Sequence, residues 1–113
     1  MSKVKLAIPV DNGVLSEHFG HTRLFEFFEI VDKKIMHNEQ LIPPPHEEGV
    51  LPRWLIDNGV TDLLTGGIGP KAINILYNKG INVYVGVEKD RAENLALNFI
   101  NDSLSFGKNY CHH

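Results

Sequence analysis

The sequence of 113 residues lacks several features that mark particular classes of protein. It contains one cysteine, so no disulfide can form within the chain, and no apolar run approaches the roughly 20 residues of a membrane-spanning helix. Its first residues lack the long apolar region of a secretory signal. The sequence has no excess of positive charge, since its formal net charge is −3. This negative charge argues against nucleic acid or an acidic membrane as a partner. We therefore expect a cytoplasmic protein with neither kind of partner.

The remaining composition is ordinary for a globular protein, with 42% hydrophobic and 22% charged residues. A chain of this length forms one domain with a real core, so we expect a single domain over residues 1–113, with an irregular tail over 102–113. Histidine is the unusual component. There are six, and the last two could be a cloning remnant: His18, His21, His37, His46, His112 and His113.

Hydrophobic patterning predicts an α/β fold with five strands and three helices. The short polar link at residues 32–34 makes the second and third strands an antiparallel hairpin. Segments 54–60 and 75–81 each read as a helix end, a glycine and a strand, and this doubled unit requires a partly parallel sheet. We expect a five-stranded mixed sheet with the hairpin at one edge and helices on its faces. The strands are predicted over 4–10, 25–31, 35–42, 60–65 and 81–87, and the helices over 50–58, 70–78 and 90–101.

The segment from Ser16 to Phe25 follows the first strand and carries two histidines three residues apart, His18 and His21, with Gly20 between them. In open α/β sheets ligands bind at the carboxyl ends of strands, where this segment lies. Imidazole is the commonest metal ligand, but one pair supplies too few ligands for a closed metal site. A surface turn with two ordinary histidines is the alternative interpretation.

A glycine-rich loop with Gly66, Gly67 and Gly69 follows the fourth predicted strand and opens a helix. Residues 67–72 fit the dinucleotide pattern G-x-G-x-x-[GA]. The chain is too short for two mononucleotide halves and a substrate domain, so a tight structural turn is favoured over nucleotide binding. An intermediate interpretation is that the backbone amides at the start of this helix bind an anion of any kind.

Further candidate metal ligands, His46, Cys111 and His112, lie in segments predicted to be loop. Thiolate together with imidazole suits iron–sulfur species, copper(I) or zinc. The sequence has no C-x-x-C pair, so neither a structural zinc nor a self-sufficient iron–sulfur site is expected. An incomplete ligand set is suited to a site that binds a preassembled cluster and later releases it. Because Cys111 lies near the chain end and no nucleophile–base pair stands out, we do not expect an enzyme.

Four runs of the sequence, in order, resemble the dinitrogenase iron–molybdenum cofactor biosynthesis family: residues 7–11 (AIPVD), 16–20 (SEHFG), 66–72 (GGIGPKA) and 80–86 (GINVYVG). The family includes the cofactor carriers of nitrogenase assembly and the orange protein. The resemblance implies a ribonuclease-H-like α/β motif without nuclease activity. It also implies that His18, in the His-Phe-Gly run, holds a metallocluster and that the glycine loop lies at the same site.

We therefore expect a small carrier or binding protein for an anionic iron–sulfur or molybdenum-containing metallocluster. Donor and acceptor proteins for the cluster would be its partners, and the protein would be a monomer or a weak homo-oligomer. The alternatives are a regulatory or scaffold module that binds a protein partner without metal, and, less favoured, a nucleotide-binding protein. The candidate cofactor-binding residues are His18, Gly66, Gly67 and Gly69, and the candidate metal ligands are His18, His21, His46, Cys111 and His112.

Overall fold

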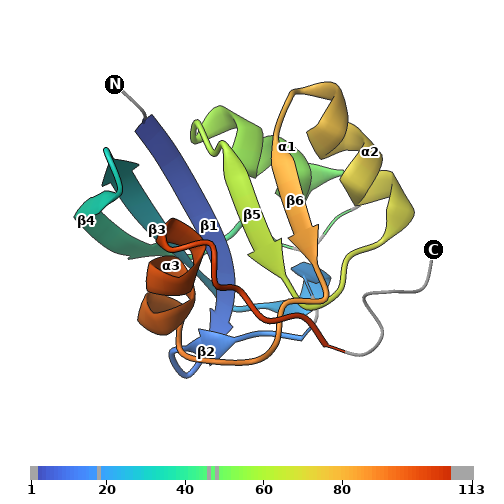
Figure 1. The fold of residues 1–113 in the computed structure, drawn as a ribbon. Coiled ribbons are helices and arrows are strands. Elements are labelled where there is room, and N and C mark those ends of the chain that lie inside the picture. The colour runs from blue at the N-terminus through green and yellow to red at the C-terminus, as the bar shows by residue number, and fades with distance from the viewer. Residues whose placement is uncertain (1–2, 18, 46, 48, 108–113) are drawn as a thin grey trace.

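The computed structural model describes residues 3–17, 19–45, 47 and 49–107 (Figure 1). Its main sheet has the strand order β4-β3-β1-β5-β6, and the short strand β2 pairs with β1 off this path. Strands β1, β5 and β6 are parallel, whereas β3 is antiparallel to both β1 and β4. In chain order the elements are β1 (Lys3–Asp11), β2 (Val14–Leu15), the 3-10 helix η1 (Phe19–His21), β3 (Leu24–Val31), β4 (Lys34–Leu41), α1 (Val50–Asp57), β5 (Asp62–Thr65), α2 (Pro70–Asn78), β6 (Asn82–Val85) and α3 (Ala92–Ile100).

The predicted α/β fold is confirmed, and the described residues form a mixed sheet, an edge hairpin and three helices, but the sheet has six strands rather than five. The additional strand is β2, because the turn at Asn12 and Gly13 reverses the chain instead of merely ending β1. Their φ angles of 54° and 81° are the positive values of a two-residue hairpin turn. The Asn-Gly sequence was itself the signal for this hairpin.

Helices α1 and α2 cover one face of the sheet, and α3 covers the other (Figure 1). The central strand β1 is buried on both faces, with Leu6 and Ile8 toward the α3 core and Ala7 toward the α1–α2 core. Burial on both faces explains why the sequence of this strand is a nearly continuous apolar run. Within the described part of the chain, no helix has the length and apolar character that a membrane crossing requires.

An aromatic cluster beneath α1 joins the segment after β2 to the core. The Phe19 ring meets Phe25 edge-on, with centroids 5.9 Å apart, and Phe25 meets Trp54 of α1 at 5.5 Å. Edge-to-face pairs of this kind add roughly 0.5–1.5 kcal/mol beyond the area that they bury. The cluster therefore fixes η1 against the start of β3.

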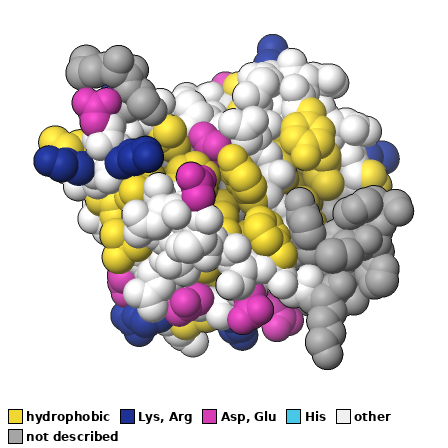
Figure 2. Space-filling model, viewed as in Figure 1, with side chains coloured by type: hydrophobic (Ala, Val, Ile, Leu, Met, Phe, Trp, Pro, Cys, Tyr) yellow, Lys and Arg dark blue, Asp and Glu magenta, His cyan; other side chains and the backbone are white. Residues whose placement is uncertain are grey.

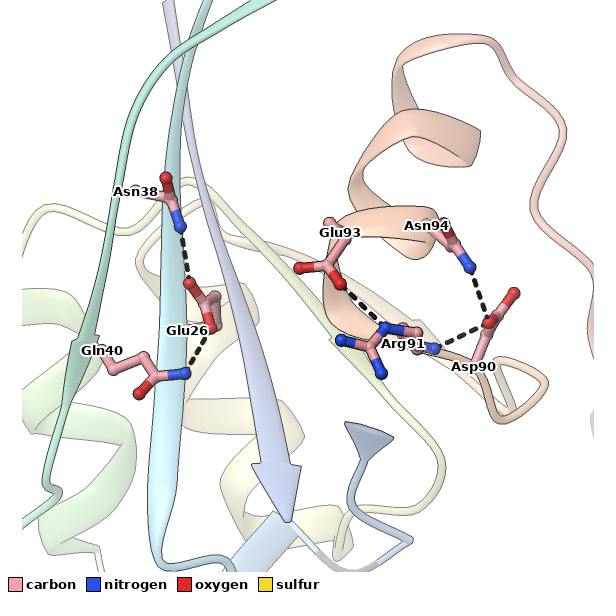
Figure 3. A network of polar contacts seen from close by, with 7 residues as sticks. All are labelled: Glu26, Asn38, Gln40, Asp90, Arg91, Glu93 and Asn94. Carbon is pink, nitrogen blue, oxygen red and sulfur yellow. Dashed lines mark hydrogen bonds and ion pairs between the residues drawn. The ribbon is translucent and has the colours of Figure 1, made fainter. Parts of the chain in front are cut away.

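A buried carboxylate lies on the α3 face, where the edge strand β4 supplies its partners. Glu26 is only 7% exposed, and it accepts hydrogen bonds from Asn38 Nδ2 at 2.8 Å and Gln40 Nε2 at 3.0 Å (Figure 3). Two amide donors offset much of the cost of burying this group. The network ties β4 to β3, so we assign Glu26 a structural role.

The turn into α3 is held by Asp90, which accepts hydrogen bonds from Asn94 Nδ2 and the Arg91 backbone N–H (Figure 3). These bonds lower the pKa of the exposed Asp90 carboxyl below its ordinary value, with the Asn94 bond contributing most. The Asp90 carbonyl also accepts from the Leu15 amide at 2.9 Å. The start of α3 is thereby attached to β2.

Candidate functional site

The carboxyl ends of β1, β5 and β6 meet at one edge of the sheet, and Phe19, which opens η1, lies there against the glycine loop (Figure 1). The Phe19 amide donates a hydrogen bond to the Gly67 carbonyl at 3.2 Å, and the Ser16 amide donates to the Pro9 carbonyl at 2.8 Å. Two motifs that are far apart in sequence are thus brought into contact. This is the edge where ligands bind in open α/β sheets.

Gly66 and Gly67 lie directly beneath the backbone of Glu17. A Cβ atom at Gly66 would come within 3.4 Å of the Glu17 Cα and carbonyl oxygen, and one at Gly67 within 3.3 Å of that oxygen. The Gly67 carbonyl also accepts a hydrogen bond from Thr65 Oγ1 at 3.1 Å. A side chain at Gly67 would press on the Glu17 carbonyl, whereas a Cβ at Gly66 would meet the Glu17 backbone at ordinary van der Waals distance, so the crossing of the two segments is tightest at Gly67. The predicted contact of these two glycines with an anion stays a prediction.

Gly69 has a different environment from the two preceding glycines. It is the N-cap residue of α2, with φ −75° and ψ 158°, a conformation that any residue adopts. A Cβ atom there would meet nothing within 4 Å. Gly69 lines a groove with space beside it, so a ligand could approach the start of α2 at this position.

The groove has a volume of about 660 Å³, within the range of small-molecule sites. Three segments form it: Phe19 and Gly20 of η1, the start of α1 with Leu51 and Pro52, and the start of α2 over residues 69–75. Phe19 is the residue that follows His18 in sequence. Phe19 and Gly20 therefore share one groove with the start of the helix that follows the glycine loop.

Two helix N-termini converge on this groove. The N-cap residues Gly49 of α1 and Gly69 of α2 offer no side-chain cap, and neither helix has an acidic residue in its first turn. The start of a helix carries partial positive charge on its exposed amides, which favours a bound anion. Lys71, in the first turn of α2, adds a full positive charge to the lining, whereas Glu47 adds a negative one. The arrangement suits an anionic ligand held largely by backbone.

The start of α1 is the part of the groove that the sequence did not indicate. Its signal was present, because Gly49 and Pro52 open α1 much as Gly69 and Pro70 open α2, each pair without a capping serine, threonine or aspartate. Nothing local to residues 49–52 shows that this helix start faces the glycine loop. That relation comes from the packing of α1 against α2.

Most of the predicted metal ligands cannot be placed. His18, His46, Cys111 and His112 lie outside the described residues, and of His21 only the backbone is described, as the last residue of η1. No three histidine, cysteine, aspartate or glutamate side chains gather around a possible metal position in the portion that the structure covers. The metal-ligand predictions therefore stay predictions.

Comparison with known proteins supports the motif resemblance. A family model described as dinitrogenase iron-molybdenum cofactor matches residues 2–102. The uncharacterised protein MJ0580 of Methanocaldococcus jannaschii is 36% identical over 86 residues, which cover 72% of this chain and 73% of that protein. The crystal structure of PH0822 matches with a TM-score of 0.89 and 31% identity, over 97% of this chain and 100% of the other.

The apo orange protein of Desulfovibrio gigas shares the fold, with a TM-score of 0.75 at 24% identity and 92% of each chain covered. The family match spans nearly the whole sequence, and it includes all the residues that line the groove. The chain therefore belongs to the dinitrogenase iron-molybdenum cofactor family.

Proposed function

We propose that this protein is a cytoplasmic carrier, not an enzyme, that binds an anionic iron–sulfur or molybdenum-containing metallocluster in the groove between η1, α1 and α2. The observation that carries the proposal is the convergence of two helix N-termini and Lys71 on one groove. Such a site stabilises negative charge through amides that are already in position. Family membership supports a cofactor-related role for the same chain.

The cluster would be the cargo of the protein and would be exchanged with donor and acceptor proteins. In this proposal His18 supplies a ligand next to Phe19, which lines the groove, and His21 and His46 are further candidates. The partial positive charge at the starts of α1 and α2 and the charge of Lys71 stabilise the cargo, while the Val50 amide donates to the Glu47 carbonyl and Pro70 has no N–H. Imidazole and sulfide-rich metal species are compatible ligand partners.

The position of the last described residue supports a part for the C-terminal thiol. The Gly107 amide donates to the Gly86 carbonyl at 2.7 Å, and the Gly86 amide donates to the Gly66 carbonyl at 3.1 Å. The chain thus leaves the described structure beside the glycine loop. Cys111 follows four residues later, and four residues span at most about 14 Å. The thiolate of Cys111 and the imidazole of His112 are therefore proposed as additional ligands.

The sharpest test substitutes Gly69, where a side chain meets no neighbour. Gly69→Asp and Gly69→Asn both provide a side-chain cap for α2, so each should raise stability by only about 0.3 kcal/mol, because glycine is itself a tolerated N-cap residue. Only the aspartate adds negative charge to the groove. Anaerobic titration with tetrathiomolybdate, followed by its absorption, should show a Kd for Gly69→Asp that is at least about fivefold weaker than that for Gly69→Asn, since both side chains cap the same amides and one added charge at close range costs roughly 1–4 kcal/mol. Equal binding by the two variants would contradict an anion site at α2.

The role of His18 is tested separately with the same probe and with iron plus sulfide. His18→Ala should fold normally and lose most of its cluster affinity. His37→Ala is the matched control, because His37 lies exposed on the edge strand β4, away from the groove lining. Unchanged affinity in His18→Ala would exclude this residue as a ligand. If the wild-type protein binds neither probe, the carrier proposal fails, and the alternative of a scaffold module without metal is favoured.

A further inference from the structure

A second hollow lies on the opposite face of the sheet, beside α3. It has a volume of about 360 Å³, at the lower end of the range for small-molecule sites. Helix α3 covers only part of this face, and Figure 2 shows hydrophobic side chains gathered there with acidic side chains among them. The sheet contributes Val4, Ile30 and Tyr84, and α3 and the segment after it contribute Phe99, Ile100, Leu104 and Phe106.

One end of the hollow is polar. The Tyr84 hydroxyl, in its lining, donates to Asp62 Oδ2 at 3.4 Å, and this carboxylate also accepts from Asn82 Nδ2 and the Thr61 hydroxyl. Asp62 is 5% exposed, and these three donors are all neutral. In the described part of the chain no cation forms an ion pair with it. A buried carboxylate without a paired cation leaves negative potential at this end of the hollow.

A second carboxylate, Asp102, lies in the lining of the hollow. Burial raises the pKa of the Tyr84 hydroxyl above its ordinary value, and the negative charges of Asp62 and Asp102 raise it further. The phenol therefore keeps its proton at neutral pH and donates a hydrogen bond to Asp62. Its oxygen retains the capacity to accept a hydrogen bond. Lys33, also in the lining, carries a positive charge that offsets part of the negative charge of the carboxylates.

We propose that this hollow binds a small organic cation with an aromatic or branched apolar body. The apolar body packs against Phe99 and the sheet floor, and the ammonium group donates to the Tyr84 oxygen and is attracted by Asp102. Charge complementarity selects the cation, because two carboxylates act on Tyr84 and one of them is buried. The site is independent of the metallocluster groove, which lies across the sheet under α1 and α2.

The test uses three probes of similar shape in titrations of the full chain followed by amide NMR shifts. These are 2-phenylethylamine, which is a cation at pH 7, neutral 2-phenylethanol and anionic 3-phenylpropanoate. The amine should move the resonances of Val4, Tyr84 and Phe99 and bind about fivefold more tightly than the alcohol, the factor expected for a partly exposed charge pair. The anion should bind more weakly than either.

Asp102→Asn removes the exposed charge and suits the backbone, because residue 102 has φ 55° and asparagine tolerates this left-handed conformation. The variant should abolish most of the amine's advantage and leave alcohol binding unchanged. Asp57→Asn, on α1, is the control and should alter neither. Equal affinity for amine and alcohol would overturn the proposal, as would tighter binding of the anion. Shifts confined to residues outside the hollow, or the absence of any shift, would also overturn it.

Discussion

The substitution Phe19→Ala tests whether the His-Phe-Gly segment is anchored through its aromatic ring. Phe19 is 5% exposed and meets Phe25 edge-on at 5.9 Å. Truncation of a buried phenylalanine costs about 3–5 kcal/mol. Because Phe19 also lines the groove, water can enter the space left behind, so we expect about 3 kcal/mol, at the low end of that range. The burial of the ring makes Phe19 the residue most suited to anchor the segment.

Urea unfolding is followed by the fluorescence of Trp54, which contacts Phe25 and Phe27 with ring centroids 5.5 and 5.6 Å apart. A loss of 3 kcal/mol should also lower Tm by about 12 °C for a domain of this size. Met36→Ala is the matched control, because Met36 is 65% exposed and its truncation should change stability by less than about 0.5 kcal/mol. If Phe19→Ala unfolds at the same urea concentration as the wild type, the ring does not anchor the segment.

Two further predictions concern the C-terminal tail and the Tyr84 hydroxyl. Deletion of residues 110–113 should raise the rate at which bound cluster transfers to a chelator and leave the fold intact; an unchanged rate, measured anaerobically, would show that the tail takes no part. The raised pKa of Tyr84 means that the unfolded chain loses this proton at a lower pH than the folded chain. The resulting stability is fully present below the ordinary pKa of about 10 and is lost as pH rises through the folded pKa. Urea unfolding at pH 8 and 10.5 should therefore show a steeper loss in the wild type than in Tyr84→Phe, and parallel losses would contradict the assigned shift.

Features that depend on neighbouring residues could be predicted from the sequence. The glycines that end α1 and α2, Gly59 and Gly80, have φ angles of 77° and 78°, the left-handed conformation that glycine adopts at helix ends. The link at Asp32 and Lys33 forms the predicted hairpin, with φ angles of 50° and 66°. In each case the turn chemistry lies within a few residues, so a local pattern is sufficient.

Features that depend on distant segments could not be predicted in the same way. The pairing of β2 with β1 is different, because it is local and has an Asn-Gly signal, and it was missed since the same turn could also simply end the strand. The α1 wall of the groove depends on how Leu51 comes to lie near the start of α2. Hydrophobic periodicity identifies which face of a helix is buried, but it does not identify the neighbour against which that face packs.

The glycine loop shows why sequence alone left several interpretations open. A run of closely spaced glycines suits an anion cradle, a dinucleotide turn and a tight structural turn, because each needs backbone without side chains. The structure assigns Gly66 and Gly67 to the crossing with Glu17 and leaves Gly69 in the groove. A side chain at Gly67 should therefore disturb the fold and the site together, since it pushes the Glu17 backbone that precedes the His-Phe-Gly residues. A side chain at Gly69 should act on the bound anion alone, and substitutions at this residue separate cargo binding from folding.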